Sequence, residues 1–225
     1  MLSENRKMAV LFDLDGTLWD ASKEVGESWD EVTKSLKTPF RVTTFDMKRT
    51  MGKTMDEIAK TLFLPYLPKE ELPALQRRCE EHENEYLKTH PGTLYPGVNE
   101  TLETLSKEYP LYIVSNCQKG YIEAFLDGTG LSPLFSGHLC YGDTLRPKGE
   151  TIRILLAKEG IASAIYVGDT DGDAKAAHFA RLPFIHASYG FGRTEEKEGS
   201  VSRFEELPDA IRPLLKGNMV VRDGK

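Results

Sequence analysis

Three short apolar runs, widely separated in the chain, most constrain how it can fold. They are residues 8–11, 111–114 and 164–167, with the sequences MAVL, LYIV and AIYV. Apolar runs of this length are typical of strands that are buried within a sheet. From residue 98 onward such runs alternate with helix-like segments, which favours a parallel sheet with helices on both faces. We therefore predict an α/β fold built on a doubly wound parallel sheet.

The first apolar run leads into two aspartates, Asp13 and Asp15, in the segment FDLDGTL at 12–18. Two carboxylates close together in a low-dielectric crevice are costly unless a cation neutralises them or one of them stays protonated. Gly16 lets the backbone approach a ligand closely, and Thr17 offers a hydroxyl donor. The segment indicates a metal-assisted site for an anionic substrate. Taken alone, it is also compatible with a polar loop after a strand.

Polar side chains also follow the second and the third apolar run. Ser115 and Asn116 come directly after the second run, and Asp169 and Asp173 lie after the third, in the segment GDTDGD at 168–173. In an open α/β sheet, ligands bind outside the carboxyl ends of the strands, so the three strand ends are expected to converge. Each predicted strand thus ends in groups that a phosphoryl-binding site needs.

These segments resemble, in order, the motifs of the haloacid dehalogenase (HAD)-like phosphatase superfamily. The segment FDLDGTL matches the family's first motif nearly letter for letter, and four motifs in order cover most of the chain. The segment ASYGFG at 187–192 resembles the phosphoglycolate phosphatase-like branch. The resemblance implies a Rossmann-like core and an enzyme that hydrolyses phosphoric monoesters.

A further motif, TLRPKGE at 144–150, offers a cation ahead of a helix with apolar periodicity. In the commonest form of the family a lysine precedes the proline, whereas here Arg146 precedes Pro147 and Lys148 follows it. Lys148 is the preferred site cation, because it would balance the carboxylates and bind phosphate as a point charge. Arg146 stays open as the alternative.

Residues 19–91 interrupt the alternation of strands and helices with a helix-like block. Charged residues are interleaved with apolar ones there, and a capping box at Thr54–Glu57 is predicted to open one of the helices. In the family, an insertion at this place is a small all-helical cap that closes over the site. We expect a cap domain at 19–91, inserted after the first strand into a core made of 1–18 and 92–225.

The chemistry expected of the two aspartates follows from phosphoryl transfer and from the resemblance. Asp13 is predicted to be the nucleophile, since a carboxylate can form an acyl phosphate. Asp15 would protonate the leaving alkoxide and later activate water. Residues expected to hold the phosphate are Ser115, the backbone amide of Asn116, Lys148 and Thr17.

A magnesium ion is the expected cofactor. Mg²⁺ prefers an oxygen-only shell with one or two carboxylates and several waters. Asp13 and Asp169 fit as direct ligands. By resemblance, the backbone carbonyl of Asp15 is a third ligand, and Asp173 assists directly or through water.

Composition narrows the class of partner. The chain has 225 residues and a formal net charge of −6, which argues against a general nucleic-acid binder. No apolar run approaches the about 20 residues that span a bilayer, and the start lacks the apolar core of a signal peptide. We expect a cytoplasmic monomer or homodimer that acts on a small phosphorylated metabolite, without nucleic-acid or membrane partners.

The sequence therefore predicts a Mg²⁺-dependent phosphatase that hydrolyses a small phosphate monoester through an aspartyl-phosphate intermediate, similar to phosphoglycolate phosphatase. A phosphomutase of the β-phosphoglucomutase type would use the same chemistry with water excluded, and nothing in the helical insertion decides between them. A dehalogenase is the third reading, but it would need no metal, and the acidic pair Asp169 and Asp173 speaks against it. A non-catalytic phosphate-binding module is the fourth reading. Specificity is expected to reside in the cap, where Lys23, Arg49 and Lys53 are candidate substrate contacts.

Overall fold

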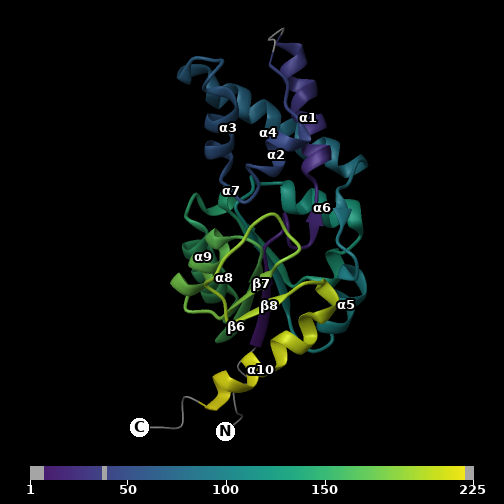
Figure 1. Ribbon diagram of the computed structural model, residues 1–225, viewed down its shortest axis with the longest axis vertical. Coiled ribbons are helices and arrows are strands. Elements are labelled where there is room, and N and C mark those ends of the chain that lie inside the picture. The colour runs from purple at the N-terminus through teal and green to yellow at the C-terminus, as the bar shows by residue number, and fades with distance from the viewer. Residues whose placement is uncertain (1–7, 37–39, 221–225) are drawn as a thin grey trace.

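The core of the molecule is a six-stranded sheet in which every neighbouring pair of strands is parallel (Figure 1). The computed structural model describes residues 8–36 and 40–220, with 215–220 described by their backbone alone. The strands lie in the order β5-β4-β1-β6-β7-β8. Their bounds are β1 (Met8–Phe12), β4 (Leu111–Ser115), β5 (Gly137–Cys140), β6 (Ser163–Gly168), β7 (Phe184–Ala187) and β8 (Gly199–Val201). The three apolar runs are thus β1, β4 and β6, which are neighbours in the interior of the sheet.

Both faces of this sheet are covered, because successive side chains of a strand point to opposite faces. In β1, Val10 and Phe12 belong to one apolar cluster, whereas Ala9 and Leu11 belong to another. The first cluster includes side chains of α5 (Val98–Leu105) and α10 (Leu207–Val220), and the second includes side chains of α8 (Lys148–Glu159) and α9 (Asp171–Phe179). The predicted doubly wound α/β fold is confirmed.

Between β1 and β4 the chain forms a helical cap, as predicted. Its helices are α1 (Ser22–Ser35), α2 (Thr44–Lys48), α3 (Met55–Phe63) and α4 (Leu72–Thr89), with the 3₁₀ turn η1 (Lys69–Glu71) before α4. They lie together beyond one end of the sheet (Figure 1). The Trp29 ring of α1 stacks on Phe63 of α3 at 5.6 Å between ring centroids. Thr54 forms the expected capping box with Glu57 at the start of α3.

Two short strands join the cap to the core. Strands β2 (Trp19–Asp20) and β3 (Thr93–Leu94) pair in antiparallel fashion, with Trp19 opposite Leu94. A Cβ atom on Gly92 would lie 2.8 Å from the Cβ of Ala21, so glycine permits this close approach. This pair could not be predicted from the sequence, because strands of two residues are too short to show an alternating pattern.

Three of the remaining elements lie between core strands, namely α6 (Tyr121–Thr129), η2 (Ser132–Leu134) and α7 (Tyr141–Thr144). The 3₁₀ turn η3 (Phe204–Glu206) lies between β8 and α10. Helix α6 packs against α4 of the cap and follows the loop at the end of β4. In the described part of the chain, every helix is too short or too polar to cross a bilayer.

Candidate active site

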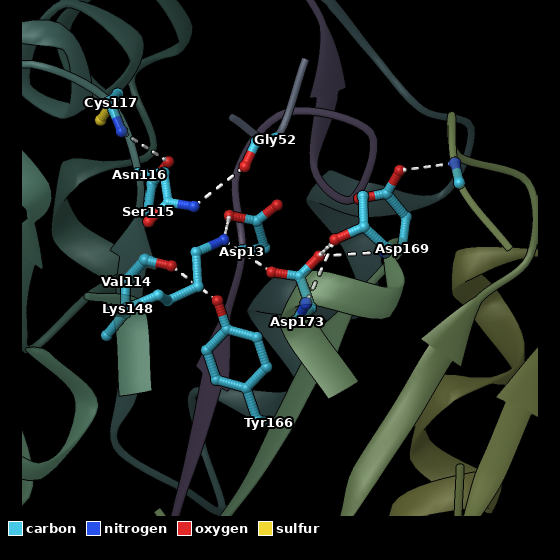
Figure 2. Close-up of polar contacts among 12 residues, drawn as sticks. Asp13, Gly52, Val114, Ser115, Asn116, Cys117, Lys148, Tyr166, Asp169 and Asp173 are labelled. Carbon is cyan, nitrogen blue, oxygen red and sulfur yellow. Dashed lines mark hydrogen bonds and ion pairs between the residues drawn. The ribbon is translucent and has the colours of Figure 1, made fainter. Parts of the chain in front are cut away.

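The ends of β1 and β6 bring three aspartates together (Figure 2). Phe12 of β1 is paired with Val167 of β6, so the residues that follow these strands leave the sheet side by side. Carboxylate oxygens of Asp13, Asp169 and Asp173 lie within 4.8 Å of one another, and all three side chains are buried. The convergence expected from the strand ends is therefore present in the structure.

Lys148 is the cation at this cluster. Its Nζ donates to Asp13 Oδ1 at 2.8 Å and to Asp173 Oδ1 at 2.6 Å (Figure 2). Burial by itself would lower the pKa of Lys148, but the Asp13 and Asp173 carboxylates outweigh it and raise that pKa well above its ordinary value. Arg146, the alternative left open by the sequence, is exposed. The lysine reaches the cluster because it begins α8, directly after Pro147.

One lysine does not balance three buried carboxylates. Burial, followed by the charge of Asp173, raises the pKa of Asp13 to about 7 against the opposing effect of Lys148. Asp13 Oδ2 and Asp169 Oδ1 are buried without a hydrogen-bond partner. Asp173 differs, since Lys148 donates to its Oδ1 and the Thr170 hydroxyl donates to its Oδ2 at 2.6 Å. Two free carboxylate oxygens with surplus negative charge suit a hard divalent cation.

Asp169 is held by the loop after β7. Its Oδ2 accepts hydrogen bonds from the backbone N–H groups of Phe191, at 2.7 Å, and of Gly192, at 3.2 Å. A Cβ atom on Gly190 would lie 2.4 Å from Asp169 Cβ and 2.3 Å from the carbonyl oxygen of Gly16. The loop thus approaches so closely that only glycine fits. The resemblance of this segment to the phosphoglycolate phosphatase-like branch did not predict this role.

Asp15 is oriented by two neighbours that the sequence analysis missed. Its Oδ1 accepts from Trp19 Nε1 at 2.9 Å and from the Tyr121 hydroxyl at 2.8 Å. Burial raises the pKa of Asp15 to about 6, although these two hydrogen bonds oppose the shift. Trp19 lies four residues away in the same turn, whereas Tyr121 comes from α6 and no local pattern connects it to Asp15.

Ser115 and Asn116 lie at the carboxyl end of β4, across from Asp13 (Figure 2). The Asn116 side chain donates from Nδ2 to the Gly52 carbonyl of the cap at 2.9 Å, a contact between cap and core that the sequence did not reveal. Thr17 is fully buried with its hydroxyl unpartnered, and it is absent from the described lining of the pocket beside Asp13.

This pocket lies between the core and the cap. On the core side it is lined by Asp13, Asp15, Ser115 and Asn116. Its empty volume is about 440 Å³, open solvent at the mouth included.

The three cap residues expected as substrate contacts, Lys23, Arg49 and Lys53, differ in their position relative to the pocket. Lys53 lines the pocket. Lys23 and Arg49 are outside its described lining, and they form ion pairs with Glu27 and Asp46 respectively.

The comparison with known families agrees with this geometry. A family model described as haloacid dehalogenase-like hydrolase matches residues 10–187, which include the nucleophile candidate, the lysine and the acidic cluster. The chain belongs to the haloacid dehalogenase-like hydrolases. Among curated relatives of this HAD hydrolase, phosphoglycolate phosphatase of Aliivibrio fischeri is 29% identical over 220 residues, covering 92% of this chain and 94% of the relative.

Two further similarities point the same way. Phosphoglycolate phosphatase of Pasteurella multocida is 34% identical over 131 residues, covering 56% of this chain and 58% of that protein. A crystal structure described as a predicted phosphoglycolate phosphatase from Haemophilus somnus superposes with a TM-score of 0.78 at 24% identity, covering 92% of this chain and 99% of that one. This HAD hydrolase is therefore a phosphatase-type enzyme, similar to the phosphoglycolate phosphatases.

Proposed function

We propose that this enzyme is a Mg²⁺-dependent phosphatase that releases phosphate from a small monoester through an aspartyl-phosphate on Asp13. One observation carries the proposal. Among the three clustered aspartates, Asp13 is the one that also lines the pocket between cap and core, in the part of the chain that the structure describes. A substrate in the pocket would therefore meet this carboxylate, with Asp15 beside it.

The residues present fit a magnesium ion. Asp13 and Asp169 would bind it through their unpartnered oxygens, the backbone carbonyl of Asp15 would add a ligand, and Asp173 would assist directly or through water. When bound, the ion supplies positive charge against which phosphoryl oxygens are placed. Lys148 would donate to the other Asp13 oxygen, and its charge opposes the rise in the pKa of Asp13 and so favours the ionised form.

The protein groups would divide the reaction into two displacements. In the first, an Asp13 oxygen bonds to phosphorus, the ester P–O bond breaks, and Asp15 gives its proton to the leaving alkoxide. In the second, Asp15 takes a proton from water as the water oxygen bonds to phosphorus and the Asp13–phosphorus bond breaks. The pKa of Asp15, about 6, suits both roles near neutral pH. Ser115 Oγ, the Asn116 amide and Lys148 would stabilise the phosphoryl oxygens.

A direct assay tests the proposal. Phosphate release from phenyl phosphate is measured with and without Mg²⁺ for the parent enzyme, for Asp13→Asn, and for the control Asp209→Asn at an exposed position in α10. We expect release that needs Mg²⁺ and that falls about a thousandfold or more in Asp13→Asn only. Equal rates for the parent and Asp13→Asn would refute the assignment. Conversion of a hexose 1-phosphate without net phosphate release would favour the phosphomutase alternative.

A further inference from the structure

The cap wall of the pocket is apolar. It is formed by side chains of α1, α2, α3 and the loop between α2 and α3, namely Val25, Trp29, Met47, Met51, Met55 and Ile58. Among the described lining residues, Lys53 is the one cation on the cap side, and its side chain is exposed. An apolar wall does not compensate a carboxylate for lost hydration. The wall therefore suits a leaving group with an apolar body.

A polar cluster lies at the pocket where α4 meets the loop after β4. Glu83 of α4 is 2% exposed, and both of its carboxyl oxygens accept hydrogen bonds, one from Trp29 Nε1 and one from Gln118 Nε2. In the described part of the chain, no lysine, arginine or histidine pairs with it. Burial raises the pKa of Glu83 to about 8, so the group is mostly neutral at pH 7.

Gln118 has an unused acceptor beside Glu83. Its Nε2 donates to Glu83 Oε1 at 3.1 Å and to Asn84 Oδ1 at 3.0 Å, so both amide hydrogens are taken. Its Oε1 is buried and lacks a partner, although Gln118 lines the pocket and is only 6% exposed. Buried polar groups are normally hydrogen-bonded, so this oxygen requires a donor that the described residues do not supply.

We propose that the leaving group of the substrate combines an apolar body with a hydrogen-bond donor, a hydroxyl or an amine, that binds Gln118 Oε1 beside Glu83. Leaving groups that carry a carboxylate are rejected, because Gln118 Oε1 can only accept a hydrogen bond. On the cap side of the described lining, the one cation, Lys53, is exposed to solvent. The inference rests on the proposed phosphatase function and deepens it. It departs from glycolate, the alcohol named in the relatives' substrate.

A set of matched esters tests the inference on the unaltered enzyme. Benzyl phosphate is compared with its meta-hydroxymethyl, meta-aminomethyl and meta-carboxy derivatives at saturating Mg²⁺, and phosphoglycolate is added as a fifth substrate. The four benzyl esters have similar leaving alcohols and differ in the distal group. We expect kcat/KM for the hydroxymethyl or the aminomethyl ester to exceed that for the carboxy ester by at least about tenfold. A preference for the aminomethyl ester over the hydroxymethyl ester would identify the donor that binds Gln118 Oε1 as an amine.

Variants test whether the preference for donor-bearing esters depends on Gln118. Gln118→Met keeps the length of the side chain but removes the acceptor, and we expect the ratio of kcat/KM between the preferred donor ester and benzyl phosphate to fall about tenfold. Gln76→Met is the matched control, since Gln76 lies on α4 outside the described lining of this pocket. We expect the control to leave this ratio unchanged.

The outcomes separate the two proposals. Phosphate release from every ester with the carboxy ester or phosphoglycolate preferred would overturn the substrate inference alone, and would indicate that Lys53 binds the anionic end. An unchanged ratio in Gln118→Met would also overturn it. Absence of Mg²⁺-dependent release from all five esters and from phenyl phosphate would overturn the phosphatase function, and the substrate inference with it.

Discussion

Replacement of Glu83 by glutamine should change how the stability of this enzyme depends on pH. Burial raises the pKa of Glu83 from 4.5 to about 8 in the folded protein. The folded state therefore holds a proton that the unfolded state has released between these two pH values. Because the unfolded state binds fewer protons there, the free energy of unfolding falls as the pH rises through this window. Glu83→Gln removes the titrating group and with it this contribution.

The expected size follows from the shift. Each pH unit inside the window contributes about 1.4 kcal/mol, so between pH 5 and pH 8 the parent should lose on the order of 4 kcal/mol more than Glu83→Gln. Urea denaturation at intervals of pH gives the free energy of unfolding for both proteins. The exposed Glu85→Gln, on the same helix, is the matched control and should follow the parent.

A constant offset between the parent and the variant is expected as well. The glutamine places a second N–H group among the donors Trp29 Nε1 and Gln118 Nε2, which costs about 1–3 kcal/mol at every pH. The offset leaves the slope unaffected. Parallel curves for parent and Glu83→Gln across pH 5 to 8 would show that Glu83 is ionised in the folded protein throughout, and the reasoning would fail.

Three further perturbations test the rest of the site. Lys148→Met leaves the buried carboxylates of Asp13 and Asp173 without their cation, so the free energy of unfolding measured in urea should fall by about 3–5 kcal/mol. A loss below about 1 kcal/mol would contradict the buried ion pairs. Gly190→Ala forces the loop away from Asp169, so half-maximal activity should need about 10–100-fold more Mg²⁺. In the control Gly199→Ala, the new Cβ would lie no closer than 3.6 Å to its neighbours, and the Mg²⁺ requirement should stay unchanged. Asp15→Asn should slow the first displacement about 10²–10⁴-fold for an alkyl phosphate and less for an aryl phosphate, because a phenolate leaves without a proton. Single-turnover bursts measure this step, and equal slowing for the two substrates would show that Asp15 is not the acid.

The strands and the acidic cluster could be predicted from the sequence because their signals are local. Apolar runs followed by Asp13, Ser115 and Asp169 predict both a parallel sheet and the edge of that sheet at which the polar side chains meet. Local sequence alone could not show whether Lys148 or Arg146 is the site cation. The answer depends on where Pro147 starts α8 relative to the cluster, which only the packed helix determines.

The polar cluster at the cap could not be predicted. Glu83 lies in a helix rich in exposed charges, and its sequence neighbours Glu80, Glu81 and Glu85 give no sign that this one is buried. Its burial results from packing of α4 against α1 and α6, which brings Trp29 of the cap and Gln118 of the core to it. Long-range packing of this kind leaves no trace in the local pattern of residue types.

The most direct test of the account is the covalent state of Asp13 during turnover. Asp15→Asn is mixed with 4-nitrophenyl phosphate and Mg²⁺, because this aryl group leaves without a proton whereas attack by water still needs the missing base. After acid quench, peptide mass spectrometry should find a hydroxylamine-sensitive phosphoryl group on Asp13, formed in step with a burst of nitrophenolate. A burst with the phosphoryl group on another residue, or rapid turnover by the parent with no phosphorylated peptide in either protein, would contradict the account.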